Sequence, residues 1–335
     1  TPSQAWLDHL RLSSTSTGSS ASFVSPDGLI LTNHHVALGS VQRISTPEHN
    51  YVRDGFFAAT RDQEIPIPGS TTKVLVSMED VTAKVNAAVK PAMDAAAARA
   101  AREAATGAIE AECVKKTGFK GQVVSLYGGA LYSLYRFKEY TDIRLVFAPE
   151  LQAAFFGGDY DNFCYPRWDL DFAFLRAYEN GKPARVEHYL QVNPQGVDDG
   201  AVVFVSGNPG KTERLKTLAC LDYDREIYVE RVARVQHQRQ VYLDYSARGA
   251  EQARRARTQL YFLGNSLKRA EGEYAGLQDA VLMAKKTAEE KALRAAVAAD
   301  PKLQAEYGGA WDRAATAYAW ARQHAADRRY RNEMP

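Results

Sequence analysis

Two short apolar runs separated by turn residues stand near the start of the chain and predict a β-hairpin. Residues 22–25 form the first run, residues 26–28 (Pro-Asp-Gly) supply the turn, and residues 29–31 form a second, fully apolar strand. Two histidines, His34 and His35, follow shortly after that second strand. Because the core behind a buried strand fixes what stands at its end, a histidine placed there is suited to act as a general base.

The pattern along the rest of the chain predicts an N-terminal helix, a series of strands and two helical regions. Residues 1–20 are expected to form a helix around Trp6 and then a polar linker, and residues 21–78 are strand-rich. Residues 79–117 are rich in Ala, Lys, Arg and Glu, which predicts helices inserted into the β structure as a solvated arm. Later strands are expected at residues 73–77, 122–127, 131–137, 141–147 and 201–206.

The length of 335 residues predicts two domains. The first covers residues 1–217 and contains the strands with the helical insertion at about 79–117. The second covers residues 218–335, where long runs of Arg, Ala and Glu with few turn residues predict helices. The basic run at residues 254–257 has acidic neighbours, so a solvated helix face explains it.

Charge and cysteine content exclude several classes of partner. A net charge of +2 gives no electrostatic footprint for nucleic acid, and no apolar run reaches the length of a membrane span. The three cysteines, Cys113, Cys164 and Cys220, do not have the spacing of a metal site, and one stays unpaired in any pairing. We therefore expect neither a metal nor another cofactor.

A histidine base in a hydrolase is normally oriented by a carboxylate, and two aspartates near residue 170 are candidates. Asp169 and Asp171 stand at alternate positions of a predicted strand, so both would face the same side. The apolar residues 172–175 directly follow Asp171 and would bury it. The sequence therefore favours Asp171 as the partner of His35 and leaves Asp169 as a rim carboxylate.

Several motifs give the chain a family resemblance. They are the Asp-Gly-Leu-Ile-Leu-Thr-Asn-His-His-Val run ending at Val36, the Gly-Gly-Asp-Tyr-Asp-Asn-Phe-Cys-Tyr-Pro-Arg run at residues 157–167, and segments 1–13, 203–210 and 265–268. Together they resemble the bacterial dipeptidyl-peptidases of serine peptidase family forty-six. The resemblance implies a β-rich double β-barrel of chymotrypsin type, with its second barrel incomplete here, and an inserted all-α domain. Residues 1–217 would then be the peptidase domain, and residues 218–335 the start of an α-helical cap domain.

The resemblance also assigns site residues and a substrate. His35 and Asp171 match the histidine and aspartate of the catalytic triad, and the substrate would be a peptide from which dipeptides are released at a free N-terminus. Asn162 and Phe163 match the residues that bind the free α-amino group, for which an amide oxygen and an aromatic face are suitable partners. Tryptophan is frequent in relatives where Phe163 stands, so the cation–π contribution should be weaker here.

The nucleophile is the main departure from the family pattern. The sequence has no G-x-S-G turn; Ser206 in Val-Ser-Gly-Asn-Pro-Gly is the nearest imitation, and Ser266 stands in a predicted helix. We therefore expect the chain to be the N-terminal half of a larger enzyme and to be inactive alone. The start at Thr1, inside an amphipathic segment, suggests a trimmed N-terminus and a periplasmic, cell-surface or secreted bacterial protein.

Two other functions stay open at this point. The first is a non-catalytic peptide-binding homologue in which His35 and Asp171 are relics, for which the absent nucleophile argues. The second is a trypsin-like heat-shock endoprotease, which shares the wording around His35. Release of dipeptides only from free N-termini would exclude the endoprotease. A homodimer also remains open as the assembly.

Overall fold

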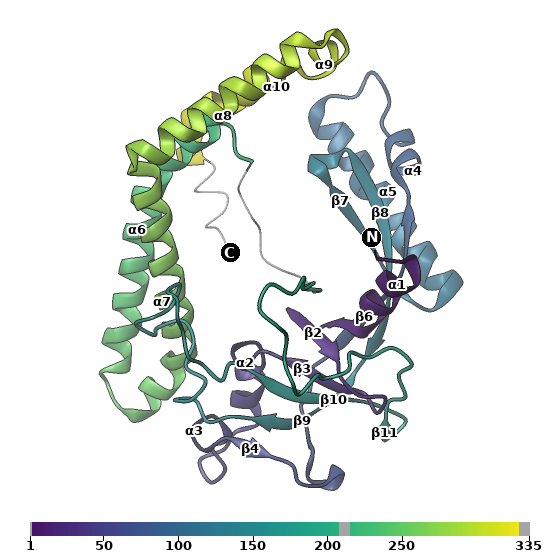
Figure 1. Cartoon of the computed structure of the whole chain (residues 1–335), viewed down its shortest axis with the longest axis vertical. Helices are drawn as coiled ribbons and strands as arrows, with labels where there is room; N and C mark the ends of the chain where they lie inside the picture. The colour runs from purple at the N-terminus through teal and green to yellow at the C-terminus, as the bar shows by residue number, and fades with distance from the viewer. Residues whose placement is uncertain (1, 208–214, 328–335) are drawn as a thin grey trace. The chain divides into compact units, whose positions relative to one another are not determined.

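The computed structural model describes residues 2–207 and 215–327, which form two compact units. The first unit holds residues 1–155 and 169–210, and the second holds residues 156–168 and 211–335. The first is built on a β-sheet and the second on long helices (Figure 1). The loop at 156–168, which the sequence assigned to the first predicted domain, lies with the helical unit. The domain boundary at 217 stays a prediction.

The first unit contains one antiparallel sheet of 11 strands, ordered β4-β9-β10-β3-β2-β1-β6-β8-β7, with β11 beside β10 and β5 beside β9. Its core includes Phe23, Ile30, Ile143 and Leu145, each at most 1% exposed. The strands are β1 Ser14–Ser16, β2 Ser20–Phe23, β3 Leu29–Thr32, β4 Phe56–Phe57, β5 Ile65–Pro66, β6 Thr72–Asp80, β7 Lys120–Leu126, β8 Leu131–Tyr140, β9 Asp142–Ala148, β10 Ala173–Glu179 and β11 Lys182–Pro183.

The helices predicted within residues 79–117 are present and pack on the sheet. One face of α5 lies so close to β7 that a Cβ on Gly121 would stand 2.9 Å from the Cβ of Cys113. Val81, Val85, Cys113 and Leu134 form a buried cluster beneath these helices. The insertion is therefore a packed element and not a wholly solvated arm. The helices of the first unit are α1 Gln4–Ser13, α2 His34–Ile44, α3 Tyr51–Asp54, α4 Thr82–Ala87 and α5 Ala95–Thr117.

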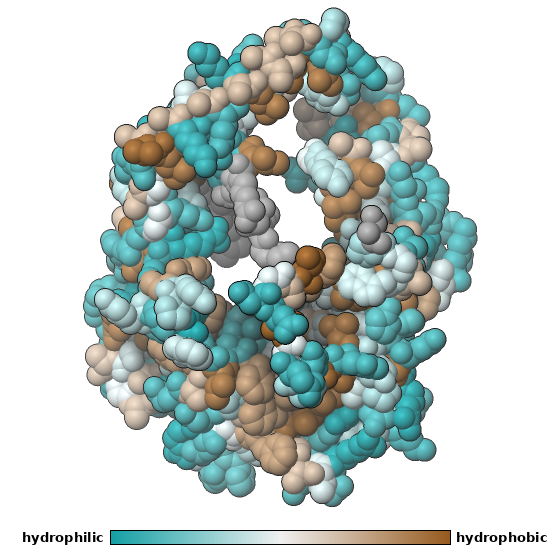
Figure 2. Space-filling model, viewed as in Figure 1, coloured by the Kyte–Doolittle hydropathy of each residue, from teal (hydrophilic) through white to brown (hydrophobic). Residues whose placement is uncertain are grey.

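Two of the predicted strand positions are wrong. Residues 201–206 form no strand, and Val202 and Val205 are 85% and 95% exposed, since no neighbouring strand pairs with this extended segment among the described residues. Apolar side chains also reach the surface elsewhere in the space-filling view (Figure 2). Asp171 does not lie on a strand but two residues before β10, because pairing with β3 begins at Ala173.

The second unit begins its long helices at Leu218, where the sequence places the change to helix. The helices α6 and α7 are each 29 residues long and pack against each other through buried residues such as Tyr228, Val235, Leu263 and Ala270. The helices of this unit are α6 Leu218–Ser246, α7 Ala250–Gln278, α8 Ala280–Ala299, α9 Pro301–Tyr307 and α10 Ala310–Gln323. In the described part of the chain, no helix has both the length and the apolar character that crossing a bilayer requires.

Candidate active site

Two adjacent inner strands of the sheet, β3 and β10, bring His35 and Asp171 together. β3 and β10 are antiparallel neighbours, with Thr32 opposite Ala173. Asp171 precedes Ala173 by two positions, and His35 follows Thr32 by three. The chain turns into α2 directly after β3, so His35 stands in the first turn of a helix instead of in a loop.

Asp171 holds both the ring and the backbone of His35. Its Oδ2 lies 2.7 Å from His35 Nδ1, and its Oδ1 accepts the His35 backbone N–H at 2.9 Å. The predicted contact between His35 Nδ1 and the Asp171 carboxylate is thus confirmed. The two side chains are 27% and 14% exposed, so the pair is shielded but still within reach of a substrate. A carboxylate on Nδ1 fixes the ring with Nε2 as the nitrogen for proton exchange.

Asn33 is a third member of the site that the sequence did not single out. Its Nδ2 donates to Asp171 Oδ2 at 3.1 Å and to the Asp171 carbonyl at 3.1 Å. The Asp171 carboxylate therefore accepts three hydrogen bonds, from Asn33 Nδ2, His35 N–H and His35 Nδ1. The only signal in the sequence was the place of Asn33 between a buried strand and the histidine pair.

The electrostatics of the site keep Asp171 ionised. Burial by itself would raise the pKa of Asp171, but the hydrogen bonds from the side chain and backbone of His35 outweigh it, and the pKa lies below its usual value. The neighbouring His34 is fully buried, and burial lowers its pKa despite the negative charge of Asp171. Neither ring nitrogen of His34 meets a hydrogen-bond partner at full geometry among the described residues, although the nearby Pro149 carbonyl opposes the lowering of its pKa. His34 is therefore a neutral core residue.

Two other sequence candidates have clear positions in the first unit. Asp169 stands half-buried two residues before Asp171. Ser206 accepts a hydrogen bond from the Ser14 hydroxyl at 2.7 Å. It also lines a cavity of about 430 Å³ that includes Asn33 and Asp171. A ligand could therefore occupy this cavity next to Asp171, the partner of His35.

The predicted amine anchor belongs to the second unit, where Asn162 is 1% exposed. Its Nδ2 donates to Asn265 Oδ1 on α7 at 3.0 Å, and its Oδ1 accepts from Arg167 Nη1 at 3.2 Å. Phe163, next to it, is 60% exposed and has a positive φ of 61°. An amide oxygen can accept two hydrogen bonds, so Asn162 Oδ1 keeps one acceptor position. Asn162 also has a structural role, because it ties the loop 156–168 to α7.

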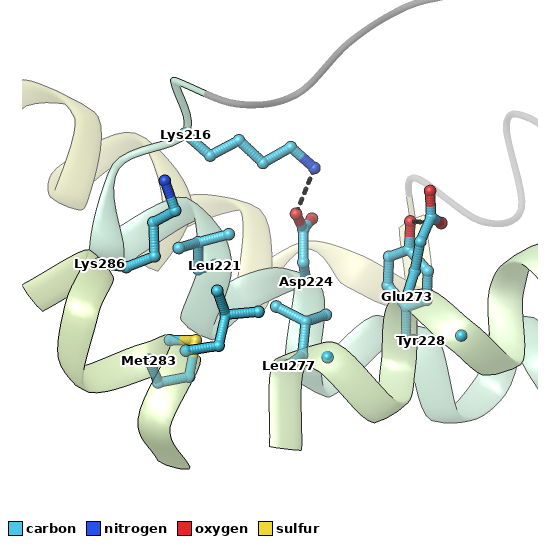
Figure 3. A pocket seen from close by; sticks show the side chains of 11 residues that line it. Lys216, Leu221, Asp224, Tyr228, Glu273, Leu277, Met283 and Lys286 are labelled. Carbon is cyan, nitrogen blue, oxygen red and sulfur yellow. Dashed lines mark hydrogen bonds and ion pairs between the residues drawn. The ribbon is translucent and has the colours of Figure 1, made fainter. Parts of the chain in front are cut away.

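A second cavity, of about 400 Å³, lies among α6, α7 and α8 (Figure 3). Its apolar wall contains Leu221, Leu277 and Met283. Its polar residues are already paired. Lys216 Nζ forms an ion pair with Asp224 Oδ2 at 2.5 Å. The Tyr228 hydroxyl donates a hydrogen bond to Glu273 Oε2 at 2.5 Å. These pairings make the cavity part of the helix packing rather than a second reactive centre.

Metal ligands do not converge at either site. Over residues 2–207 and 215–327, no group of three or more His, Cys, Asp or Glu side chains could hold an ion. No disulfide joins Cys113, Cys164 and Cys220, all of which lie in the described ranges.

Comparison with known proteins shows which family the chain belongs to. The sequence profile described as Peptidase S46 matches residues 1–335. The chain belongs to the peptidase S46 family. The family resemblance inferred from the sequence motifs is therefore confirmed.

Individual relatives agree with this assignment. Dipeptidyl-peptidase 7 of Capnocytophaga gingivalis is 30% identical over 93% of this chain and 45% of its own length. The Asp/Glu-specific dipeptidyl-peptidase of Shewanella putrefaciens is 32% identical over 84% of this chain and 40% of its own. The crystal structure of Porphyromonas endodontalis DPP11 in complex with the dipeptide Arg-Glu matches with a TM-score of 0.78 and 25% identity, over 94% of this chain and 48% of that one. The chain thus spans less than half the length of these S46 relatives.

Proposed function

We propose that this S46 chain supplies the general base and its orienting carboxylate to a serine-type dipeptidyl-peptidase that releases dipeptides from free N-termini. The observation that carries the proposal is the contact of Asp171 with Nδ1 of His35 beside a cavity. Curated relatives named as dipeptidyl-peptidases, and a related structure with a bound dipeptide, support the substrate class. The antiparallel sheet would be the first barrel of a chymotrypsin-type pair.

In the proposed reaction, Nε2 of His35 takes the proton of a serine hydroxyl as the serine attacks the peptide carbonyl. The same nitrogen then gives that proton to the departing amine. Asp171 holds the imidazole in the required tautomer and stabilises the imidazolium that forms. The ion-pair partner of this imidazolium must be charged, which the lowered pKa of Asp171 provides.

The nucleophile is proposed to come from sequence outside these 335 residues, since none of their serines stands in a G-x-S-G turn. Three serines, Ser20, Ser22 and Ser206, line the cavity that contains Asn33 and Asp171. None stands in a G-x-S-G turn; the nearest imitation is Ser206, whose hydroxyl accepts from Ser14. It is followed by Gly-Asn-Pro-Gly, which runs into residues outside the described part. We therefore assign Ser206 no catalytic role, which leaves the 335-residue chain inactive by itself.

Asn162 and Phe163 are proposed to receive the α-ammonium of the substrate. Asn162 Oδ1 would use its remaining acceptor position, and the exposed ring of Phe163 would offer its face. Because Asn162 is almost fully buried, the ammonium would have to reach it from the side of Phe163. A periplasmic, cell-surface or secreted location would give such an enzyme access to oligopeptides.

The test is hydrolysis by the full-length protein of paired substrates that differ only in an N-acetyl group. Release of a dipeptide from the free amine, abolished in His35→Ala, supports the proposal. Cleavage of the blocked substrate would favour an endoprotease instead. Tight peptide binding with no turnover in the full-length protein would favour the non-catalytic homologue. The observation that supports this alternative is the lack of a G-x-S-G turn in this sequence.

A further inference from the structure

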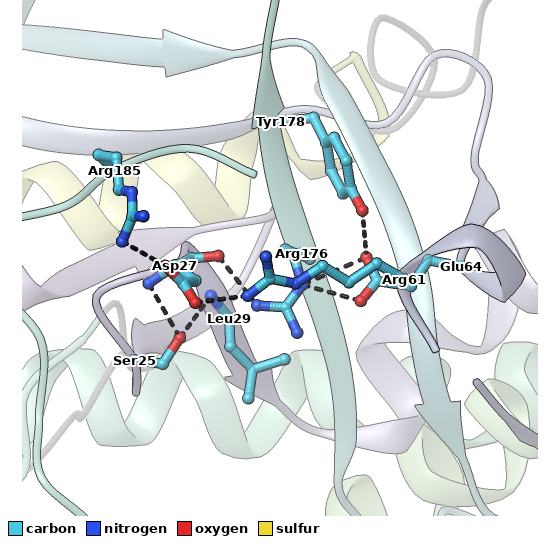
Figure 4. A network of polar contacts seen from close by, with 8 residues as sticks. All are labelled: Ser25, Asp27, Leu29, Arg61, Glu64, Arg176, Tyr178 and Arg185. Carbon is cyan, nitrogen blue, oxygen red and sulfur yellow. Dashed lines mark hydrogen bonds and ion pairs between the residues drawn. The ribbon is translucent and has the colours of Figure 1, made fainter. Parts of the chain in front are cut away.

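A buried polar cluster lies at the end of the β3–β10 pair that is remote from His35 and Asp171. Arg176, on β10, donates from Nε to Glu64 Oε1 at 2.8 Å and Oε2 at 3.2 Å, and from Nη1 to the Asp27 carbonyl at 2.9 Å. Tyr178 donates its hydroxyl to Glu64 Oε2 at 2.8 Å. The side chains of Arg176 and Glu64 are only 11% and 3% exposed (Figure 4).

The cluster also fixes the turn that begins β3. The Asp27 carboxylate contacts Arg61 at 2.5 Å and Arg185 at 2.7 Å, one on each oxygen. Ser25 Oγ accepts the backbone N–H groups of Asp27 and Leu29. Arg176 belongs to β10, and its guanidinium is therefore hydrogen-bonded to the turn that precedes β3.

The apolar residues of the two strands define their register only weakly. β3 is four residues long and reads Leu-Ile-Leu-Thr, and β10 opens with Ala-Phe-Leu, so apolar side chains stand on both faces of the paired segment, beside Thr32 and Arg176. A strand that is apolar on both faces can slip without exposing a polar face to the core. On its other side, β10 pairs with β9 through a register irregularity between Phe174 and Leu175.

We propose that Glu64 and Arg176 are positioning residues, whose buried contact with the β3 turn sets the β3–β10 register that brings Asp171 to His35. The assignment rests on the proposed function of that pair. A directional, buried ion pair tolerates one register, whereas apolar contacts tolerate several. Arg176 opposite Leu29 fixes Ala173 opposite Thr32, three steps along the ladder.

The site is sensitive to this register because its residues lie just beyond the paired region. A slip of one residue turns every side chain of a strand to the other face, and a slip of two moves it by about 6.8 Å. The contact between Asp171 Oδ2 and His35 Nδ1 spans only 2.7 Å. Either slip would separate the two groups while leaving most apolar burial intact.

The experiment observes the His35 Nδ1 proton directly by NMR in the 335-residue chain. A proton held between an imidazole and a carboxylate is strongly deshielded, and its resonance is assigned by its absence in His35→Gln. The main variant is Glu64→Met/Arg176→Met, which replaces the ion pair with apolar side chains of comparable length and so avoids an unpaired buried charge. Arg185→Met is the control, because it removes only the arm of the cluster that is 83% exposed.

We expect the double variant to lose the resonance or to split it into several, while Arg185→Met keeps it unchanged. A double variant with the single wild-type resonance would overturn the inference. If the double variant does not fold, Glu64→Gln decides, since it keeps the shape and one acceptor for Arg176: a split or weakened resonance supports the inference, and an unchanged one refutes it. Peptidase activity does not enter this readout, so failure of the proposed function would appear separately, as an intact resonance in an inactive full-length protein.

Discussion

The Asp171 carboxylate forms two hydrogen bonds with His35: Oδ2 lies 2.7 Å from the ring Nδ1, and Oδ1 lies 2.9 Å from the backbone nitrogen. The second contact matters as much as the first, because it fixes the start of α2 relative to the loop before β10. The imidazole therefore has little freedom to rotate away from the carboxylate. This is the arrangement that an orienting group in a hydrolase requires.

Removing the charge of Asp171 should abolish most of the activity of the full-length enzyme. In Asp171→Asn, the amide would favour the wrong tautomer of His35 and could not stabilise an imidazolium, so we expect kcat to fall roughly 10³- to 10⁴-fold. The measurement is steady-state hydrolysis of a dipeptidyl substrate. Asp169→Asn is the matched control and should keep near-normal kcat. Equal losses in both variants would show that the orienting carboxylate has been misassigned.

The free energy of unfolding should fall on the acid side in two steps. Burial lowers the pKa of His34 below its usual 6.5, so the unfolded chain binds a proton first. The stability tied to neutral His34 is complete above that value and is lost as pH falls through the folded pKa. Asp171, whose pKa is below 3.8 in the folded chain, adds a loss that begins only near that lower pH.

Replacing His34 separates the two steps. His34→Leu fills the same buried position without a titrating group, so the decline in stability that sets in as pH falls below about 6.5 should become shallower. The decline at lower pH should remain. Urea unfolding of the 335-residue chain across this range checks the prediction, with wild type in parallel. An unchanged slope just below pH 6.5 would mean that His34 titrates alike in the folded and unfolded states.

Asn162→Ala in the full-length enzyme should reduce its preference for a free N-terminus. Loss of one hydrogen-bond partner of an ammonium costs about 1.5–3 kcal/mol, or roughly ten- to a hundredfold in kcat/KM. Free and N-acetylated substrates are compared before and after the change. Because Asn162 also bonds Asn265 on α7, Asn265→Ala is the control: it removes the structural contact and leaves the amine partner. A preference lost equally in both variants would assign Asn162 a structural role alone.

Ser206→Ala should leave the kcat of the full-length enzyme within about twofold of wild type, since the change removes one half-buried hydroxyl and its contact with Ser14 and no part of the proposed machinery. The hydroxyl accepts from Ser14 and stands in no turn that supplies an oxyanion hole. Hydrolysis is measured alongside the thermal unfolding midpoint, which reports the lost Ser14 contact. A collapse of kcat with an unchanged midpoint would make Ser206 the nucleophile and would remove the need for one elsewhere.

The sequence alone predicted the local elements and the pairing of His35 with Asp171. Turn residues 26–28 between two apolar runs predict the hairpin, and period-2 alternation predicts β6 to β9, because these signals act between near neighbours. The choice of Asp171 over Asp169 followed from the apolar run after it, which is also a local property. The family motifs added a role for each residue.

Tertiary structure decided what depends on partners far along the chain. Residues 201–206 have strand composition, but a strand exists only when a neighbour pairs with it, and none does in the described part. The burial of Asn162 follows from its bond to Asn265, 103 residues away. Asn33 became part of the site only when β10 placed Asp171 beside it. Hydrogen bonds across 100 or more residues are set by packing, which no local pattern encodes.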